Sequence, residues 1–246
     1  MNISGNTILV TGGGSGIGKA LATRFLDRGN EVIVCGRRKD VLDQLVSEHP
    51  QIRTRVCDIS LRKEREALVK WSITEFPSLN VLVNNAGIQK RIDLTQSDDL
   101  QDIESEITIN LQAPIRLCQL LQRHFVTQDA AAFVNVTSGL SFVPLANVPV
   151  YCATKAALHS FTLSLRWQLR ETSVEVIEII PPAVDTDLQA PGLHKFGVDV
   201  DEFADHVFAE LEKGESEIAY GTALAASRAS REELNEIYER MNGAFH

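Results

Sequence analysis

The sequence predicts an α/β fold, a doubly wound and seven-stranded parallel sheet with helices on both faces. Three observations support this prediction. Short β-branched runs alternate with longer stretches of helical spacing along the chain. The runs are almost continuously apolar, which is typical of strands buried on both faces. No proline-rich or serine-rich linker and no internal repeat interrupts the sequence, so we expect residues 1–246 to form one domain.

Seven short runs are the expected strands, and turn residues or helical stretches bound each of them. They are residues 7–10, 31–35, 52–57, 79–83, 131–136, 174–180 and 217–221. Intervening stretches such as GKALATRFLDRG and YCATKAALHSFTLSLRWQLRE have the apolar spacing of helices. The acidic tail REELNEIYERMNGAFH predicts a solvated amphipathic helix.

The composition narrows the range of partners. A net charge of -9 argues against nucleic acid or an anionic membrane as the main partner. The first residues, MNISGNTILV, lack the basic region of a signal peptide, and no apolar run reaches the length of a membrane span. The four cysteines are far apart and show no C-x-x-C spacing. We therefore expect a cytoplasmic protein with reduced cysteines and no metal site.

A glycine-rich turn, VTGGGSGIGKA, connects the first expected strand to the first expected helix. Gly12, Gly16 and Gly18 give the spacing G-x-x-x-G-x-G, with Ser15 and Ile17 between them. Glycines at such a turn let the backbone approach a pyrophosphate, and the helix N-terminus supplies N–H donors and positive potential. We therefore expect a dinucleotide site in a Rossmann domain.

Two related phosphate-binding motifs fit this turn less well. The G-x-G-x-x-G motif fails because, counted from Gly12, its last position is Ile17. The phosphate loop G-x-x-x-x-G-K-[ST] matches at Gly13, Gly18 and Lys19, but Ala20 replaces the hydroxyl that binds magnesium. Nucleoside triphosphate hydrolysis is therefore discounted.

The end of the second expected strand bears on the choice between NAD and NADP. An acidic residue there binds the ribose 2′-hydroxyl of NAD, whereas arginine accommodates the 2′-phosphate of NADP. Glu31 lies too early, at the start of the strand, and Gly36 is followed by Arg37, Arg38 and Lys39. Guanidinium groups make strong bidentate contacts with phosphate. We predict NADP(H), bound mainly by Arg37 and then by Arg38, with a solvated basic turn and NAD(H) as the alternative.

Further motifs follow later strands. NNAG occupies residues 84–87, VTSG occupies residues 136–139, and the stretch YCATK places Tyr151 and Lys155 four residues apart on one face of an expected helix. With T-G-x-x-x-G-x-G, this order and spacing resembles the short-chain dehydrogenase/reductase family from residue 11 to about residue 186.

The resemblance implies an oxidoreductase that moves a hydride between a nicotinamide cofactor and a carbonyl or alcohol. Tyr151 would be the general acid in reduction and the base in oxidation, and Ser138 would hydrogen-bond the substrate oxygen. Lys155 would hold the nicotinamide ribose and lower the tyrosine pKa, and Asn110 would hold a water linking Lys155 to solvent. A free phenol has a pKa of about 10, which a nearby ammonium lowers.

The resemblance also implies further cofactor contacts. They are Asp58 and Ile59 at the adenine ring, Asn85, Ala86 and Gly87 at the adenine ribose, and Val184 and Thr186 at the carboxamide and pyrophosphate. One departure concerns the last two residues, because Pro181-Pro182 stands where most members have P-G. A second proline removes an N–H and restricts φ, so we expect a stiffer or displaced loop.

The substrate is less well defined than the reaction. We expect a small carbonyl or alcohol compound under a short lid at about residues 187–201. The expected apolar wall is Leu140, Phe142, Leu145 and Val148. A polar or anionic substrate end could meet Gln89, Lys90 and Arg91, although a solvated loop is the favoured interpretation for Lys90 and Arg91.

Two further expectations concern assembly and an alternative function. His159 is interpreted as a packing or interface residue, and the resemblance implies a homodimer or homotetramer joined by the helical stretches at roughly residues 99–124 and 150–170. A redox sensor that binds a dinucleotide without turnover is the alternative from another functional class.

Overall fold

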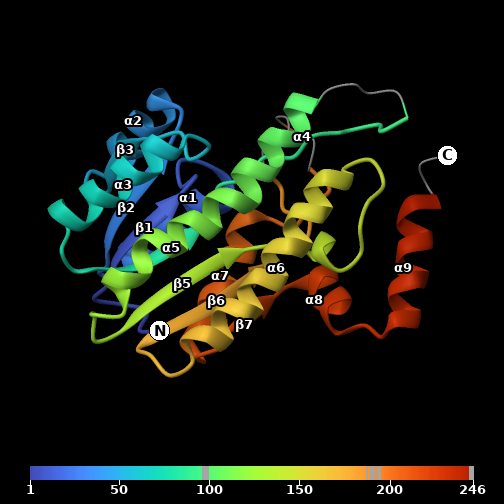
Figure 1. Cartoon of the computed structure of the whole chain (residues 1–246). Coiled ribbons are helices and arrows are strands. Elements are labelled where there is room, and N and C mark those ends of the chain that lie inside the picture. The colour runs from blue at the N-terminus through green and yellow to red at the C-terminus, as the bar shows by residue number, and fades with distance from the viewer. Residues whose placement is uncertain (96–99, 187, 189–191, 193–194, 244–246) are drawn as a thin grey trace.

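The computed structural model of the chain describes residues 1–95, 100–186, 188, 192 and 195–243. Within them lies a seven-stranded sheet of order β3-β2-β1-β4-β5-β6-β7, in which all neighbouring strands are parallel (Figure 1). The strands are β1 Thr7–Thr11, β2 Glu31–Gly36, β3 Arg53–Val56, β4 Leu79–Asn84, β5 Ala131–Val136, β6 Val174–Ile180 and β7 Glu217–Ala219. The predicted parallel sheet is confirmed.

Helices connect the strands and cover both faces of the sheet. They are α1 Gly16–Asp27, α2 Lys39–Glu48, α3 Arg62–Glu75, α4 Leu100–Ile107, α5 Ala113–Phe125, α6 Pro149–Leu169, α7 Val200–Glu212, α8 Gly221–Arg228 and α9 Arg231–Gly243. A π-helical turn, η1 Thr108–Gln112, joins α4 to α5, and a 3-10 turn, η2 Gly139–Ser141, follows β5. Among the described residues, no helix combines the length and the apolar character that crossing a membrane requires.

The two faces of the sheet bury two apolar layers. Because successive strand residues point to opposite faces, Val10 of β1 packs in the layer with α1, α2 and α7, whereas Leu9 packs in the layer with α3, α5 and α6. Phe25 of α1 meets Phe208 of α7 edge-on at 4.7 Å between ring centroids. Both layers consist largely of buried side chains, which explains why the central strands β1, β2, β4 and β5 are rich in apolar residues. The edge strand β3 reads RTRV and is partly exposed.

The strand order determines where a ligand can bind. β1 pairs with β2 on one side and with β4 on the other, so the chain proceeds outward from β1 in two directions. In open parallel sheets, ligands bind beyond the carboxyl ends of the strands at this reversal. The segments after β1, β2, β4, β5 and β6 are therefore the ones that can build a site.

The C-terminal helix α9 stands apart from the sheet, to the right in Figure 1. None of its side chains is fully buried. Asn242, near its end, accepts a hydrogen bond from the Ala146 N–H at 2.7 Å and donates to the Pro144 carbonyl at 3.1 Å. These bonds fasten α9 to the loop that precedes α6.

Candidate active site

The glycine turn packs directly against the loop that follows β4. A Cβ atom at Gly12 would lie 2.8 Å from the Cα atom of Ala86, and Gly12 has a φ of +65°. A Cβ atom at Gly18 would lie 2.5 Å from the Gly12 carbonyl oxygen and would also collide with the amide of Asn85. Glycine is therefore required at both positions by the approach of two backbone segments, and the N-terminus of α1 stays open.

Thr11 joins these two segments, a role that the sequence did not predict. Its hydroxyl oxygen accepts hydrogen bonds from the backbone N–H groups of Asn85 and Ala86, each at 3.1 Å. In return, the Asn85 side chain donates to the carbonyls of Thr11 at 3.1 Å and Gly12 at 3.3 Å. The threonine before the first glycine was the available signal.

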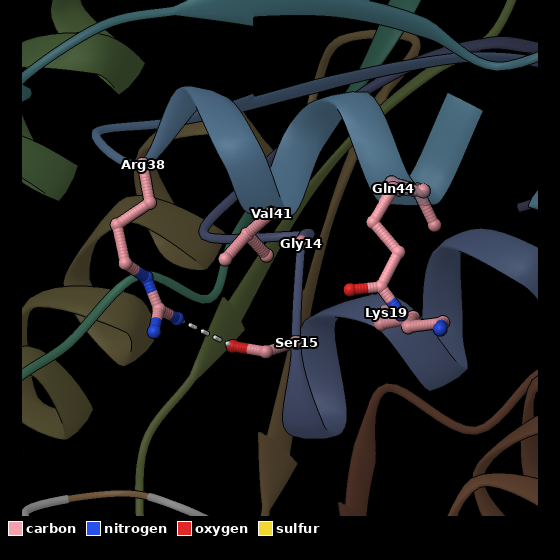
Figure 2. A pocket seen from close by; sticks show the side chains of 7 residues that line it. Gly14, Ser15, Lys19, Arg38, Val41 and Gln44 are labelled. Atoms are coloured by element: carbon pink, nitrogen blue, oxygen red, sulfur yellow. Dashed lines mark hydrogen bonds between the residues drawn. The ribbon is translucent and has the colours of Figure 1, made fainter. Parts of the chain in front are cut away.

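The basic turn after β2 lies beside the glycine turn, as Figure 2 shows. Arg38 donates from Nη2 to the Ser15 hydroxyl at 3.2 Å. Lys39 instead pairs with Asp43 one turn along α2, and Lys19 pairs with Glu48. A cavity of about 260 Å³ lies between the turns, lined by Gly14, Ser15, Lys19, Arg38, Val41, Gln44 and Leu45.

A larger cavity of about 1010 Å³ extends from this region to α6 across the carboxyl ends of the strands. The structure brings every predicted cofactor residue to its wall. These are Gly12, Ser15, Gly16, Ile17, Gly18, Arg37, Arg38, Asp58, Ile59, Asn85, Ala86, Gly87, Tyr151, Lys155, Val184 and Thr186. Ser138 lines the same cavity, so the predicted dinucleotide-binding and reactive residues share one space.

Three predicted catalytic residues gather at the inner end of this cavity. Lys155 donates from Nζ to the Val136 carbonyl at 2.8 Å and lies 5.7 Å from the ring centroid of Tyr151. The Ser138 hydroxyl hydrogen-bonds to the Tyr151 phenol and accepts from the Leu140 N–H at 3.1 Å. All three side chains are buried, yet they reach the cavity wall.

Burial controls the pKa values of this group. It raises the pKa of the Tyr151 phenol, and the hydrogen bond from Ser138 opposes that rise. Burial also lowers the pKa of Lys155 to about 8. The sequence-based expectation that Lys155 lowers the tyrosine pKa is therefore not met, because desolvation dominates at both side chains. The protein itself favours a protonated phenol, the form that a general acid needs.

Asn110 lies behind the cavity wall, in the π-helical turn η1. Its Oδ1 atom accepts from the Ile88 N–H at 2.8 Å, and its Nδ2 atom donates to the Ile88 carbonyl at 2.8 Å and to Thr154 at 3.3 Å. Single π-helical turns often occur at functional sites. Because the Asn110 side chain bonds to both Ile88 and Thr154, it holds the loop after β4 against α6. The sequence placed Asn110 in a helix but did not predict the π turn.

No sequence pattern indicated a role for Glu106, which lies one turn before Asn110. Its side chain is fully buried, and Oε1 accepts from the Lys90 N–H at 2.8 Å. Within the described part of the chain, Oε2 is buried without a hydrogen-bond partner. Burial raises the pKa of this carboxyl to about 7. A glutamate in a polar helical stretch gave no signal of burial, because the burial arises from tertiary packing, including that of α4 on α6.

The predicted apolar wall is partly wrong. Leu140 and Leu145 line the cavity, as expected, together with Val143. Val148 is instead buried beside Tyr151, and Phe142 packs edge-on against His159 at 4.8 Å between ring centroids. Both side chains therefore pack against other residues and do not line the cavity.

The polar rim also differs from the prediction. Gln89 and Lys90 line the cavity, whereas Arg91 is exposed and lies outside its described wall. Lys90 forms an ion pair with Asp102 at 3.3 Å, so its ammonium is not merely solvated. The predicted lid lies partly outside the described residues, at 187, 189–191 and 193–194, while Leu188 and Phe196 line the cavity.

The C-terminal helix contributes to the cavity, contrary to its interpretation as a solvated tail. The predicted helix is confirmed, but Ile237, Arg240 and Met241 face the cavity from α9. The hydrogen bonds of Asn242 to the loop before α6 hold the helix there. No local pattern in the tail indicated this contact, because it depends on a loop almost a hundred residues earlier.

The loop after β6 is not displaced, although Pro182 led us to expect a stiffer or displaced loop. Val184 forms a parallel bridge with Val198, and Asp185 donates to the Val198 carbonyl at 2.8 Å. A Cβ atom at Gly16 would lie 3.2 Å from the Thr186 methyl group, so the loop meets the start of α1. The second proline therefore does not displace Val184 or Thr186 from the cavity.

Comparisons with known proteins agree over most of the chain. A family model described as short chain dehydrogenase matches residues 6–195. The uncharacterized oxidoreductase DltE of Bacillus subtilis (strain 168) is 47% identical, and the alignment covers 98% of each chain. The segments NNAGIQK, VTSGLSFVPL, PVYCATKAALHSF and PPAVDTDL already resembled the oxidoreductase encoded with the D-alanyl-lipoteichoic acid genes of Gram-positive bacteria, and this identity confirms that likeness.

Solved structures share the fold. A short chain dehydrogenase from Burkholderia cenocepacia J2315, in complex with NADP, has a TM-score of 0.84 and 25% identity, covering 97% of this chain and 99% of that one. A 3-ketoacyl-(acyl-carrier-protein) reductase from Brucella melitensis, complexed with NADH, has a TM-score of 0.81 and 23% identity, covering 90% and 100%. Proteins of this architecture thus include binders of both dinucleotides.

Proposed function

Because the chain belongs to the short-chain dehydrogenase family, we propose that it is an NADP(H)-dependent oxidoreductase that interconverts a carbonyl and an alcohol. One observation carries the proposal. Ser138, Tyr151 and Lys155 meet at the inner end of the same cavity that all the predicted cofactor residues line. We further propose that the whole chain acts as one domain in the cytoplasm.

The cavity fits a nicotinamide dinucleotide. Substitution of Gly12 or Gly18 by any larger residue would push the glycine turn into its neighbours, so the turn keeps the start of α1 open for a pyrophosphate. Asp58 and Ile59 would contact the adenine end, and Lys155 would contact the nicotinamide ribose. The bound cofactor would supply or accept the hydride.

The protein's own residues would manage the proton and the substrate oxygen. In reduction, the Ser138 hydroxyl holds the carbonyl oxygen and the Tyr151 phenol donates its proton to it as negative charge develops. Burial keeps the phenol protonated until that moment. Lys155 lies beside the ring and, with its pKa lowered to about 8, can replace the transferred proton near neutral pH.

The preference for NADP(H) rests on the basic turn. Arg37 and Arg38 line the cavity beside the glycine turn, and Arg38 already contacts Ser15. Their guanidinium groups offer a bidentate site for a 2′-phosphate. Lys39 takes no part, because it pairs with Asp43.

A titration with NADPH and with NADH, followed by nicotinamide fluorescence, tests the cofactor assignment. Tighter binding of NADPH supports the proposal, and equal or tighter binding of NADH favours an NAD(H)-dependent alcohol dehydrogenase. Absorbance assays over a set of aldehydes, ketones and alcohols then test turnover. If the protein binds a dinucleotide but turns over none of these compounds, the result would support the redox sensor instead.

The exposed face of α6 is consistent with an oligomer. Leu163 and Trp167 are 42% and 69% exposed on it, and Leu120 of α5 is 37% exposed. We propose that these helices join subunits into a homodimer or homotetramer. Sedimentation analysis of the wild type and of Trp167→Glu tests this, since the variant should shift the protein toward the monomer.

A further inference from the structure

The helix α6 carries three polar side chains on one face, Tyr151, Lys155 and His159, each four residues after the last. They engage three consecutive residues at the end of β5. Lys155 binds the Val136 carbonyl, and Tyr151 meets the Ser138 hydroxyl. His159 reaches the residue between them, Thr137, through a carboxylate.

That carboxylate belongs to Glu178 of β6, which is fully buried. His159 donates from Nδ1 to Glu178 at 2.9 Å from Oε2 and 3.0 Å from Oε1. The Thr137 hydroxyl donates to Oε1 of the same carboxylate at 2.7 Å. A buried polar group is costly unless it is hydrogen-bonded, so His159 and Thr137 together keep Glu178 in place.

The surroundings of His159 favour its charged form. Its hydrogen bond to Glu178 raises the pKa of the imidazole, burial opposes this, and the charge of Glu217 on β7 adds to the rise. Arg166, two turns further along the same face of α6, lowers the pKa of His159. Its guanidinium donates to the carbonyls of Val176 on β6 and of Ser216, just before β7. Phe142 covers the ring edge-on from the η2 side.

We propose that His159 and Glu178 position Ser138 for reaction by holding the hydroxyl of Thr137, the residue next to it in the chain. This rests on the proposed oxidoreductase function and extends it to two residues outside the predicted site. His159 lies outside the described cavity wall, so it acts as a positioning residue through Glu178 and Thr137. Loss of its proton weakens the hold on Glu178 and loosens the end of β5.

Variants separate positioning from simple stability. His159→Asn keeps an N–H donor near the position of Nδ1 but cannot titrate, whereas His159→Leu removes the donor. Thr137→Val removes the hydroxyl, and Thr137→Ser retains it. His206→Asn is the matched control, because His206 is also half-buried with one hydrogen bond to a carbonyl, that of Ala219.

The activity assay uses reduction of 4-nitrobenzaldehyde by NADPH across a range of pH. His159→Leu and Thr137→Val should lower kcat about 10- to 100-fold, since small misplacement of a reacting group has effects on this order. Their affinity for NADPH should stay within about twofold of the wild type. Thr137→Ser should restore kcat, and His159→Asn should keep it while losing one titration from the pH profile.

A second measurement does not depend on turnover. In NMR titrations of the wild type, the amide signals of Ser138 and Gly139 should shift with the same midpoint as the His159 ring, and this shift should vanish in His159→Asn. Independent midpoints would overturn the proposal, as would Thr137→Val with a lower Tm but unchanged kcat. If the wild type reduces no carbonyl compound, the proposed function fails, and the amide titration still decides the positioning role.

Discussion

Lys155 donates a hydrogen bond of 2.8 Å from Nζ to the carbonyl oxygen of Val136. Val136 is the last residue of β5, two positions before Ser138, and Lys155 lies one turn after Tyr151 on α6. One bond therefore sets the helix against the strand end and brings the phenol of Tyr151 opposite the hydroxyl of Ser138. The proton donor and the group that holds the substrate oxygen are aligned by this contact.

Tyr151→Phe should abolish turnover while preserving the binding of cofactor. Loss of a positioned general acid lowers kcat by about 10²–10⁴-fold. The ring still fills its buried site, so NADPH affinity should stay within about twofold. Steady-state kinetics and fluorescence titration measure the two effects. Tyr220→Phe is the control, because that phenol donates to Glu202 near the surface and does not line the cavity as described. Retained turnover in Tyr151→Phe would contradict the proposed mechanism.

Arg37→Asp should weaken NADPH binding about 10- to 100-fold and leave NADH binding nearly unchanged. The reason is the loss of charge-assisted bonds to the 2′-phosphate, each worth about 1.5–3 kcal/mol. Fluorescence titration with both dinucleotides measures the ratio. Lys39→Ala, at a neighbouring cation that pairs with Asp43, should leave both affinities unchanged. Equal loss for NADPH and NADH would rule out a specific 2′-phosphate contact.

Gly18→Ala should destabilise the fold by about 1–3 kcal/mol, the usual cost of overpacking, and should abolish dinucleotide binding. The added methyl group would meet the Gly12 carbonyl oxygen at 2.5 Å and the Asn85 amide. Thermal unfolding and NADPH titration test both effects. Gly243→Ala is the comparison, since nothing lies within 4 Å of a Cβ atom there. An unchanged Tm for Gly18→Ala would show that the two loops can separate freely.

Glu106→Gln should flatten the dependence of stability on pH. Burial raises the folded-state pKa of this carboxyl from 4.5 to about 7, so the folded state binds the proton more tightly than the unfolded state does. Its contribution is fully present below about pH 4.5 and is lost as the pH rises through about 7. The free energy of unfolding, measured with denaturant at intervals of about one pH unit between about pH 5 and 8, gives this dependence on pH.

The matched control for this prediction is Glu104→Gln, which changes an exposed carboxylate two residues earlier on α4. It should leave the slope of the wild type intact. If the free energy of unfolding depends on pH in the same way in Glu106→Gln and Glu104→Gln, burial does not raise the pKa of Glu106 and the prediction is wrong.

Local sequence was sufficient for the sheet and for the central residues of the site. Strands β5 and β6 begin and end at the predicted residues, because runs of mainly apolar residues suit a strand covered on both sides, although β6 also carries Glu175 and Glu178. The glycine spacing after β1 and the four-residue spacing of Tyr151 and Lys155 are also local, since each depends on one turn or one helix face.

Contacts between distant segments could not be predicted from the sequence. The bonds of His159 and Thr137 to Glu178 join α6, β5 and β6, and Asn242 reaches a loop far earlier in the chain. The expected lowering of the Tyr151 pKa was likewise wrong. The four-residue spacing indicates which side chains are neighbours, but it does not indicate how much water surrounds them. Desolvation is a property of the packed protein, and it is the largest cause of both the raised pKa of Tyr151 and the lowered pKa of Lys155.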